Sequence, residues 1–209
     1  MSFLSKVKAK YLVIAANRYW HGSPKDHGNI LKVLPYEYEE GDGHVGVHDF
    51  GGVFLAEEKT DHIHGGENFW YFIDLKDSEI LSLNDLYHRH YKDPKVKEVL
   101  ERLLPDMNID DSDEVTREKE ENNDTKSNAE FIWDEICGRS TRRNRYRSST
   151  ERLHHLLGSD GCRDGEWQLQ TIQGQIAEAL GFKAVELEDE RGTAYLLVGP
   201  NEMQKEDTN

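Results

Sequence analysis

The stretch that decides the fold is Lys183–Val198, with the sequence KAVELEDERGTAYLLV. Its two apolar runs, Lys183–Leu187 and Thr193–Val198, flank a polar segment of three acids, an arginine and a glycine. Runs of this composition on either side of such a turn are typical of two antiparallel strands joined as a hairpin. We therefore predict a β-hairpin at this position.

A helix is predicted immediately before this hairpin. Leu169, Ile172, Ile176 and Leu180 recur at helical spacing in the segment that starts at Gly165. Gly181 follows the last of them and is suited to the residue after a helix, because glycine adopts a positive φ without steric cost. The helix and hairpin together favour an α+β fold.

Further strands are predicted in the first half of the chain. The clearest is Phe69–Leu75 (FWYFIDL), and a buried strand is expected at Val53–Ala56 after two glycines. Aromatic residues up to His21 also suit a strand, which Gly22-Ser23-Pro24 ends because proline cannot donate to a ladder. Residues 25–50 are rich in glycine, histidine and acids, and we predict a long connection there.

The middle of the chain alternates in charge. Helices are predicted at Pro94–Leu104 and Ala129–Cys137, and the acidic segment Asp106–Asp124 between them is expected to be a mobile loop. Arg139–His155 then holds six arginines. It reads either as a solvated helix end opposing the acidic loop or as a contact for phosphate or a partner. We expect one domain over residues 1–200 with an insertion at about 84–164, and a polar tail over 201–209.

Composition limits the classes of protein. The 209 residues carry 26 basic and 41 acidic side chains, a formal charge of −15. This balance argues against a protein whose whole surface binds nucleic acid. No apolar run approaches the length of a membrane span, and the first ten residues lack the apolar core of a signal peptide. Two cysteines, Cys137 and Cys162, are too few for a disulfide scaffold, so a cytosolic location is expected.

Three short segments contain the residues suited to chemistry. A histidine at a strand end, His21, can hydrogen-bond a ligand hydroxyl, and Gly22 lets a planar ligand approach the backbone. Phe54 lies in the predicted buried strand, and Asp189 and Glu190 lie at the hairpin tip. Each segment also has a purely structural interpretation, and only the combination is informative.

The order of these segments resembles the ADP-ribosyltransferase superfamily, in particular its poly-ADP-ribose-polymerase-like branch and the ADP-ribosylating anti-CRISPR proteins that act on type I-F complexes. The family's His-Thr-Ser-Pro segment is similar to His21-Gly22-Ser23-Pro24. Its Leu-Gly-Phe and Asp-Glu-x-Gly-Thr segments are similar to residues 180–182 and 189–193. The resemblance covers residues 17–83 and 165–198, and it implies a split β-sheet core with flanking helices and a charged helical or loop insertion.

The resemblance implies transfer of ADP-ribose from NAD to a macromolecular acceptor, with release of nicotinamide and without a metal. Positive charge develops on the sugar as the glycosidic bond breaks, so a carboxylate from Asp189 or Glu190 would stabilise the transition state. His21 would hold the adenosine ribose, and the Gly22 backbone would pair with the nicotinamide amide. Ser23 and Phe54 complete the implied NAD site.

One departure from the branch concerns nicotinamide stacking. The branch has a tyrosine after its second strand, whereas residues 57–64 contain none. Either the stacking ring comes from elsewhere, such as Tyr71 or Trp70, or the nicotinamide pocket is built differently. This departure favours mono-ADP-ribosylation over polymer synthesis.

The acceptor and two other functions stay open. The closest resemblance favours a protein side chain on a CRISPR effector or other host factor, in conflict between phage and host. The arginines of Arg139–Arg152 allow a toxin-type enzyme that modifies RNA or DNA instead. A non-enzymatic acidic decoy for a nucleic-acid-binding complex is the third possibility. A metal site built on His44, His48, His62 and His64 is the fourth, although only the spacing of the last two fits one face of a strand.

Overall fold

The computed structural model describes residues 16–34, 52–59, 69–106, 113–139, 151–153, 156, 164–189 and 192–207. Strands and helices alternate in blocks along the chain, as the sequence predicts. The strands are β1 (Asn17–Ser23), β2 (Ile30–Val33), β3 (Gly52–Leu55), β4 (Phe69–Leu75), β5 (Ile80–Leu81), β6 (Ala184–Asp189), β7 (Gly192–Val198) and β8 (Asn201–Lys205). The helices are η2 (Asp77–Glu79), η3 (Asp85–Arg89), α2 (Pro94–Asp106), α3 (Asp113–Asn122), α4 (Asn128–Ile136) and α6 (Asp164–Leu180).

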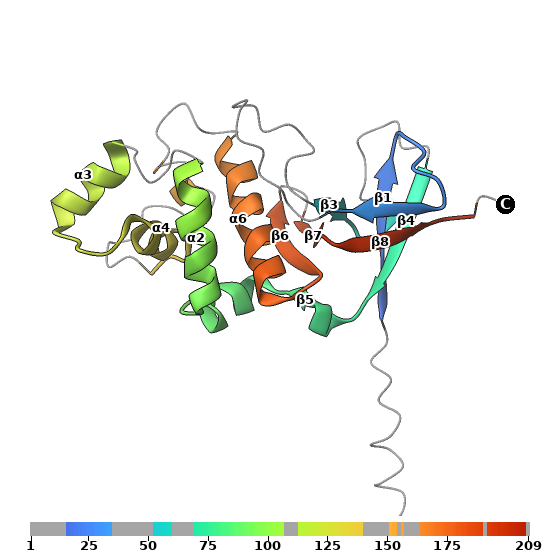
Figure 1. Ribbon diagram of the computed structural model, residues 1–209, viewed down its shortest axis with the longest axis horizontal. Helices are drawn as coiled ribbons and strands as arrows, with labels where there is room; N and C mark the ends of the chain where they lie inside the picture. Colours follow the sequence, from blue (N-terminus) through green and yellow to red (C-terminus); the bar gives the residue numbers. More distant parts are fainter. Residues whose placement is uncertain are drawn as a thin grey trace, which may run out of the picture.

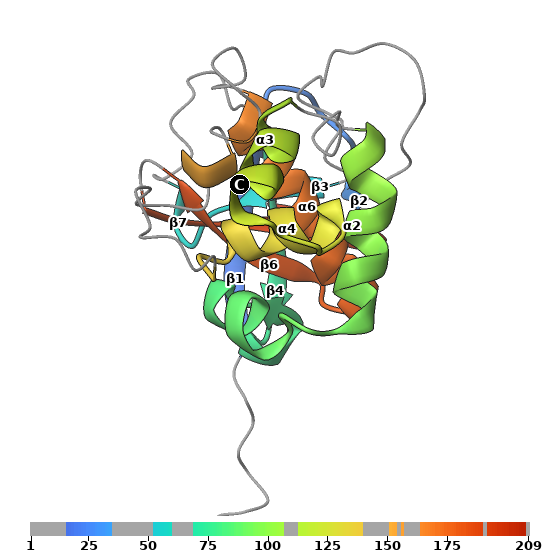
Figure 2. The ribbon, with the colours of Figure 1, turned by 90° about the vertical axis from the view of Figure 1, so that its left-hand side faces the viewer.

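The strands form two sheets of four. The first sheet has the order β1-β4-β8-β2, and the second has the order β3-β7-β6-β5. The helices α2, α3, α4 and α6 lie beside the second sheet, and the first sheet lies at the other end of the molecule (Figure 1). Seen from the helical end, α2, α3 and α4 stand in front of the strands (Figure 2). The prediction of an α+β fold is confirmed.

The hairpin predicted at Lys183–Val198 is present as β6 and β7. Its register pairs Ala184 with Leu197 and Asp189 with Gly192. The preceding helix, α6, ends as predicted, because Gly181 has a φ of +87° and its N–H donates to the carbonyl of Glu178 at 2.9 Å. The predicted strands β3 and β4 and the helices α2 and α4 are also confirmed.

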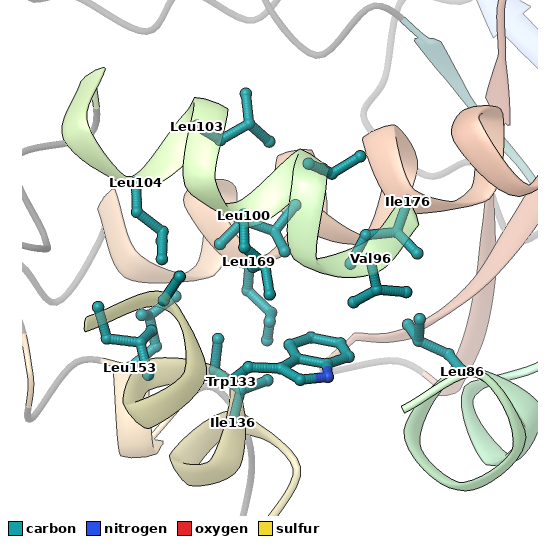
Figure 3. Packing of buried hydrophobic residues seen from close by; sticks show 14 of the residues in the cluster. Leu86, Val96, Leu100, Leu103, Leu104, Trp133, Ile136, Leu153, Leu169 and Ile176 are labelled. Carbon is teal, nitrogen blue, oxygen red and sulfur yellow. The ribbon is translucent and has the colours of Figure 1, made fainter. Parts of the chain in front are cut away.

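The helices and the second sheet share one core. Leu100 and Leu103 of α2, Trp133 of α4, and Leu169 and Ile176 of α6 pack together there (Figure 3). A second core lies between the two sheets; its buried members include Tyr19, Leu55, Tyr71, Leu197 and Met203. The two faces of β3 therefore serve different cores, since Leu55 packs into the second core and Phe54 against the first.

Three expectations about irregular segments are wrong. Residues 25–50 are not one long connection, because β2 pairs antiparallel with β8. The acidic segment is not a loop throughout: α3 forms, and Val115 is fully buried. The chain from Asn201 is not a polar tail, because β8 lies between β4 and β2 and Met203 is fully buried. The single domain with an insertion stays a prediction, and only its predicted end at residue 200 is revised.

Candidate functional site

Among the described residues, a single β-bridge connects the backbones of the two sheets. The Trp20 N–H donates to the Ala56 carbonyl at 2.8 Å, and the Ala56 N–H donates to the Trp20 carbonyl at 2.9 Å. Within the described residues this bridge, between β1 and the residue after β3, is isolated, so the two strands form no continuous ladder. The arrangement is a split sheet, with the split beginning beside His21.

In a continuous sheet the Phe54 carbonyl would accept a hydrogen bond from the backbone of β1, and here the His21 imidazole takes that place. Its Nδ1 lies 3.0 Å from the carbonyl oxygen of Phe54. Because a carbonyl only accepts, we infer that Nδ1 carries the proton in this bond, and Nε2 of the neutral ring is then an acceptor. An acceptor at this position suits a hydroxyl group of a ligand.

Gly22 presents its backbone to the split. In an antiparallel strand the N–H and C=O of alternate residues point to the same edge. The two groups of Trp20 point toward β3, so those of Gly22, two residues further on, point to the same side. A donor and an acceptor from one extended residue therefore face β3 at a position where the two strands form no ladder.

Ser23 is directed elsewhere. It is buried, its hydroxyl donates to the Lys25 carbonyl at 3.0 Å, and it accepts from the Lys25 N–H at 3.2 Å. His27 Nε2 lies 3.2 Å from the same hydroxyl oxygen. These contacts use the Ser23 hydroxyl to shape the loop that follows β1.

Asp189, one of the two predicted acidic residues, lies in the second sheet. Position 189 ends β6, and the strands β7 and β3 lie between β6 and β1. Three strand spacings correspond to about 14 Å across the sheet. The described structure includes the backbone of Asp189 but not its side chain, and Glu190 lies outside the described residues. The strand of His21 is thus linked to the strand of Asp189 through the bridge and the second sheet. Whether either carboxylate points toward His21 stays a prediction.

A cluster of ionisable residues beside the bridge was not predicted from the sequence. The Tyr195 hydroxyl donates to Glu57 Oε1 at 2.9 Å, and the rings of Tyr195 and Tyr19 meet edge to face with centroids 4.9 Å apart. Burial, followed by the bond to Glu57, holds the pKa of Tyr195 well above its usual range. Glu57 directly follows a predicted strand, which is the only sequence signal that pointed to it.

The two rings considered for stacking on nicotinamide, Tyr71 and Trp70, differ in their exposure. Tyr71 is fully buried, and its hydroxyl accepts from the His27 N–H at 2.7 Å, so it is not available to stack on a ligand. Trp70 is half-buried and pairs in register with Gly22. Lys59 Nζ lies 4.3 Å from the Trp20 ring centroid and 5.6 Å from that of Trp70, so a cation covers both rings.

The other predicted sites receive little support. His44, His48, His62 and His64 lie outside the described residues, as do residues 140–150 of the arginine-rich segment. In the part of the chain that the structure describes, no group of three or more histidine, cysteine, aspartate or glutamate residues is arranged to hold a metal ion. Arg139 stacks on Tyr91, 3.9 Å from the ring centroid, and donates to the Tyr87 carbonyl at 3.0 Å. Its guanidinium therefore links helices within the protein.

An open polar hollow of about 510 Å³ lies at the helical end of the molecule. Residues of α3 and of the connection to α4 line it. Figure 1 shows α3 at the opposite end from β1, so this hollow is separate from the split. None of the helices in the described part of the chain combines the length and apolar character needed to cross a bilayer.

Comparison with known proteins relates the chain to ADP-ribosyltransferases. Residues 133–205 match the family described as "Anti-CRISPR Type I-F ADP-ribosyltransferase AcrIF11". The matched part runs from α4 through β8 and is about a third of the chain. A solved structure described as "Crystal structure of an anti-CRISPR protein" is similar over 91% of this chain and 96% of that chain, at 20% identity and a TM-score of 0.46. No curated protein matches.

The family match confirms the predicted relation to ADP-ribosylating anti-CRISPR proteins. It includes the hairpin with Asp189 and Glu190, as the sequence analysis expected, and it extends further in both directions. It begins at Trp133, inside the segment predicted as an insertion, and includes β8. The His21-Gly22 segment lies outside the matched residues.

Proposed function

We propose that this protein is a mono-ADP-ribosyltransferase that uses NAD as the donor substrate and releases nicotinamide. The observation that carries the proposal is the interrupted ladder beside Gly22, where one extended residue turns a donor and an acceptor toward β3 beyond the isolated Trp20–Ala56 bridge. The similarity of residues 133–205 to an ADP-ribosyltransferase family supports the same reaction class.

The Gly22 backbone is complementary to the nicotinamide amide. A carboxamide has an N–H donor and a C=O acceptor on one planar group, and an extended residue offers the opposite pair. Glycine at this position leaves no Cβ to obstruct a planar ring. In this proposal the amide of nicotinamide takes the place that a continuous β3 would occupy.

His21 would bind the adenosine ribose. With Nδ1 donating to the Phe54 carbonyl, Nε2 accepts a hydrogen bond from a ribose hydroxyl. The bond to Phe54 also fixes the ring plane before NAD binds, which lowers the entropy lost on binding. Phe54 contributes through its carbonyl, and its ring, on the other face of β3, is a candidate wall of the site.

The reaction breaks the bond between C1′ of the nicotinamide ribose and the ring nitrogen, and both electrons leave with nicotinamide. An acceptor nucleophile then bonds to C1′, and its proton passes to a carboxylate. Asp189 or Glu190 is proposed for this role, since an anion next to the cationic sugar stabilises the transition state more than the ground state. Ser23 is no longer proposed as a direct NAD contact, because its hydroxyl bonds within the loop.

The acceptor is proposed to be a protein side chain on a CRISPR effector complex, in conflict between phage and host in the cytoplasm. The family relation supports a target of this kind. Arg139 contacts Tyr91 and Tyr87, so this one arginine of the segment is used within the protein and is not proposed to bind a nucleic-acid acceptor.

The test is nicotinamide release and label transfer from radiolabelled NAD, measured with purified effector complexes and, separately, with RNA and DNA. We expect transfer to protein, and its loss in an Asp189→Ala/Glu190→Ala variant. Retention of inhibition by that variant without any NAD turnover would identify a decoy. Transfer only to RNA or DNA would identify the toxin-type enzyme.

A further inference from the structure

The end of β8 contacts both segments that leave the split. Lys205 and Glu206 are consecutive, and Lys205 pairs in register with Tyr71 of β4. One contacts the loop after β1, and the other contacts the segment after β3. We refer to these two residues as the C-terminal clamp.

The first arm of the clamp is Lys205. Its Nζ lies 2.8 Å from Asp26 Oδ2, and its N–H donates to the Asn29 carbonyl at 2.9 Å. Asp26 Oδ1 accepts from the Gly28 N–H at 2.9 Å and from the Tyr71 hydroxyl at 3.3 Å. The hydrogen bond from Lys205, followed by that from the Gly28 N–H, lowers the pKa of Asp26, so this carboxylate is ionised at neutral pH.

The Lys205 arm fixes the loop that begins directly after Gly22 and Ser23. The Tyr71 hydroxyl accepts from the His27 N–H, and His27 Nε2 approaches the Ser23 hydroxyl. The chain from the end of β1 to residue 29 is therefore held at several points by residues of the neighbouring strands β4 and β8.

The second arm of the clamp is Glu206. Its carboxylate bonds the Lys59 ammonium, and its own N–H donates to the Trp70 carbonyl at 2.8 Å. Lys59 lies over Trp20 and Trp70, which are the neighbours of Gly22 along β1 and across to β4. The side chains of Lys59 and Glu206 are about one-third exposed.

We propose that Lys205 and Glu206 are positioning residues that set the geometry of the split at Gly22 for NAD. This inference rests on the proposed function, because it assigns no chemistry to the clamp itself. The residues that set the affinity for NAD would then lie at the end of β8, which supplies no residue to the proposed NAD site.

The test measures NAD affinity and thermal stability of the full chain for Lys205→Met and Glu206→Gln. Each substitution removes a charge and keeps most of the side-chain volume. Matched controls on the same sheet are Lys32→Met and Glu202→Gln, a pair 4.0 Å apart and both largely exposed. We expect the dissociation constant for NAD to rise about 5- to 10-fold in each clamp variant and less than about 2-fold in each control.

A charge-preserving variant keeps the inference falsifiable if a clamp variant is poorly stable. Lys205→Arg retains a cation that can bond the Asp26 carboxylate, so its affinity should stay within about 3-fold of the wild type. Unchanged affinity in both clamp variants, or equal losses in clamp and control variants, would overturn the inference. Absence of NAD binding by the wild-type chain would instead overturn the proposed function.

Discussion

Replacing His21 separates its two hydrogen bonds. His21→Ala removes the donor to the Phe54 carbonyl, which lies 3.0 Å away on a half-buried strand. Loss of that bond should lower the free energy of unfolding by about 1 to 2 kcal/mol, or the Tm by about 2 to 8 °C for a chain of this length. His21→Asn keeps an N–H near the position of Nδ1 and removes the acceptor at Nε2. It should therefore be nearly as stable as the wild type and bind NAD about tenfold more weakly.

The measurements are urea denaturation followed by fluorescence, and NAD titration by calorimetry. His90→Asn is the matched control, because His90 contacts Phe182 among the helices, with ring centroids 5.9 Å apart. His21→Asn should differ from His21→Ala in stability and resemble it in NAD affinity. Equal stability of the alanine and wild-type proteins would refute the Phe54 bond, and full NAD affinity of the asparagine variant would refute the role of Nε2.

Three further predictions concern packing and protonation. Gly52→Ala should destabilise the protein by about 1 to 3 kcal/mol in urea, because its Cβ would lie 2.5 Å from the backbone oxygen of Leu197; a loss under about 0.5 kcal/mol would mean that the strands relax. Met203→Ala should cost about 2 to 5 kcal/mol by the same measurement, since the side chain is fully buried, and a loss typical of a surface site would contradict the placement of β8. Burial raises the pKa of Cys137 far above its usual range, so in a Cys162→Ser background this thiol should react with a disulfide reagent at pH 8 about tenfold more slowly than after unfolding. Equal rates would show that Cys137 is accessible as thiolate.

The elements predicted correctly are those whose pattern is local. The helix α6 and the β6–β7 hairpin carry apolar residues at the expected spacing and a glycine where the helix ends. The strand β8 was not predicted, because its sequence, NEMQK, has one apolar residue, and that residue packs into a core formed by strands distant in the sequence. The helix α3 was not predicted, because its many acids suggested a loop. Glutamate, lysine and arginine are nevertheless good helix formers, and the buried Val115 packs one face of the helix against the core.

The candidate site was predictable only in part. The sequence indicated His21 and Gly22 through a histidine and a glycine at a strand end. The separation of β1 from β3 depends on pairing between residues 36 positions apart, Trp20 and Ala56, which no local pattern encodes. The contacts of Ser23 and Tyr71 depend likewise on how the loop after β1 folds back onto β4.

The position of β8 has a consequence for biosynthesis. It is the last of the described strands to leave the ribosome, yet it lies inside the first sheet and pairs with both β4 and β2. Until it emerges, the ladder partner that β2 has in the described structure is missing. Translation must therefore reach at least residue 206 before the strand order β1-β4-β8-β2 can form.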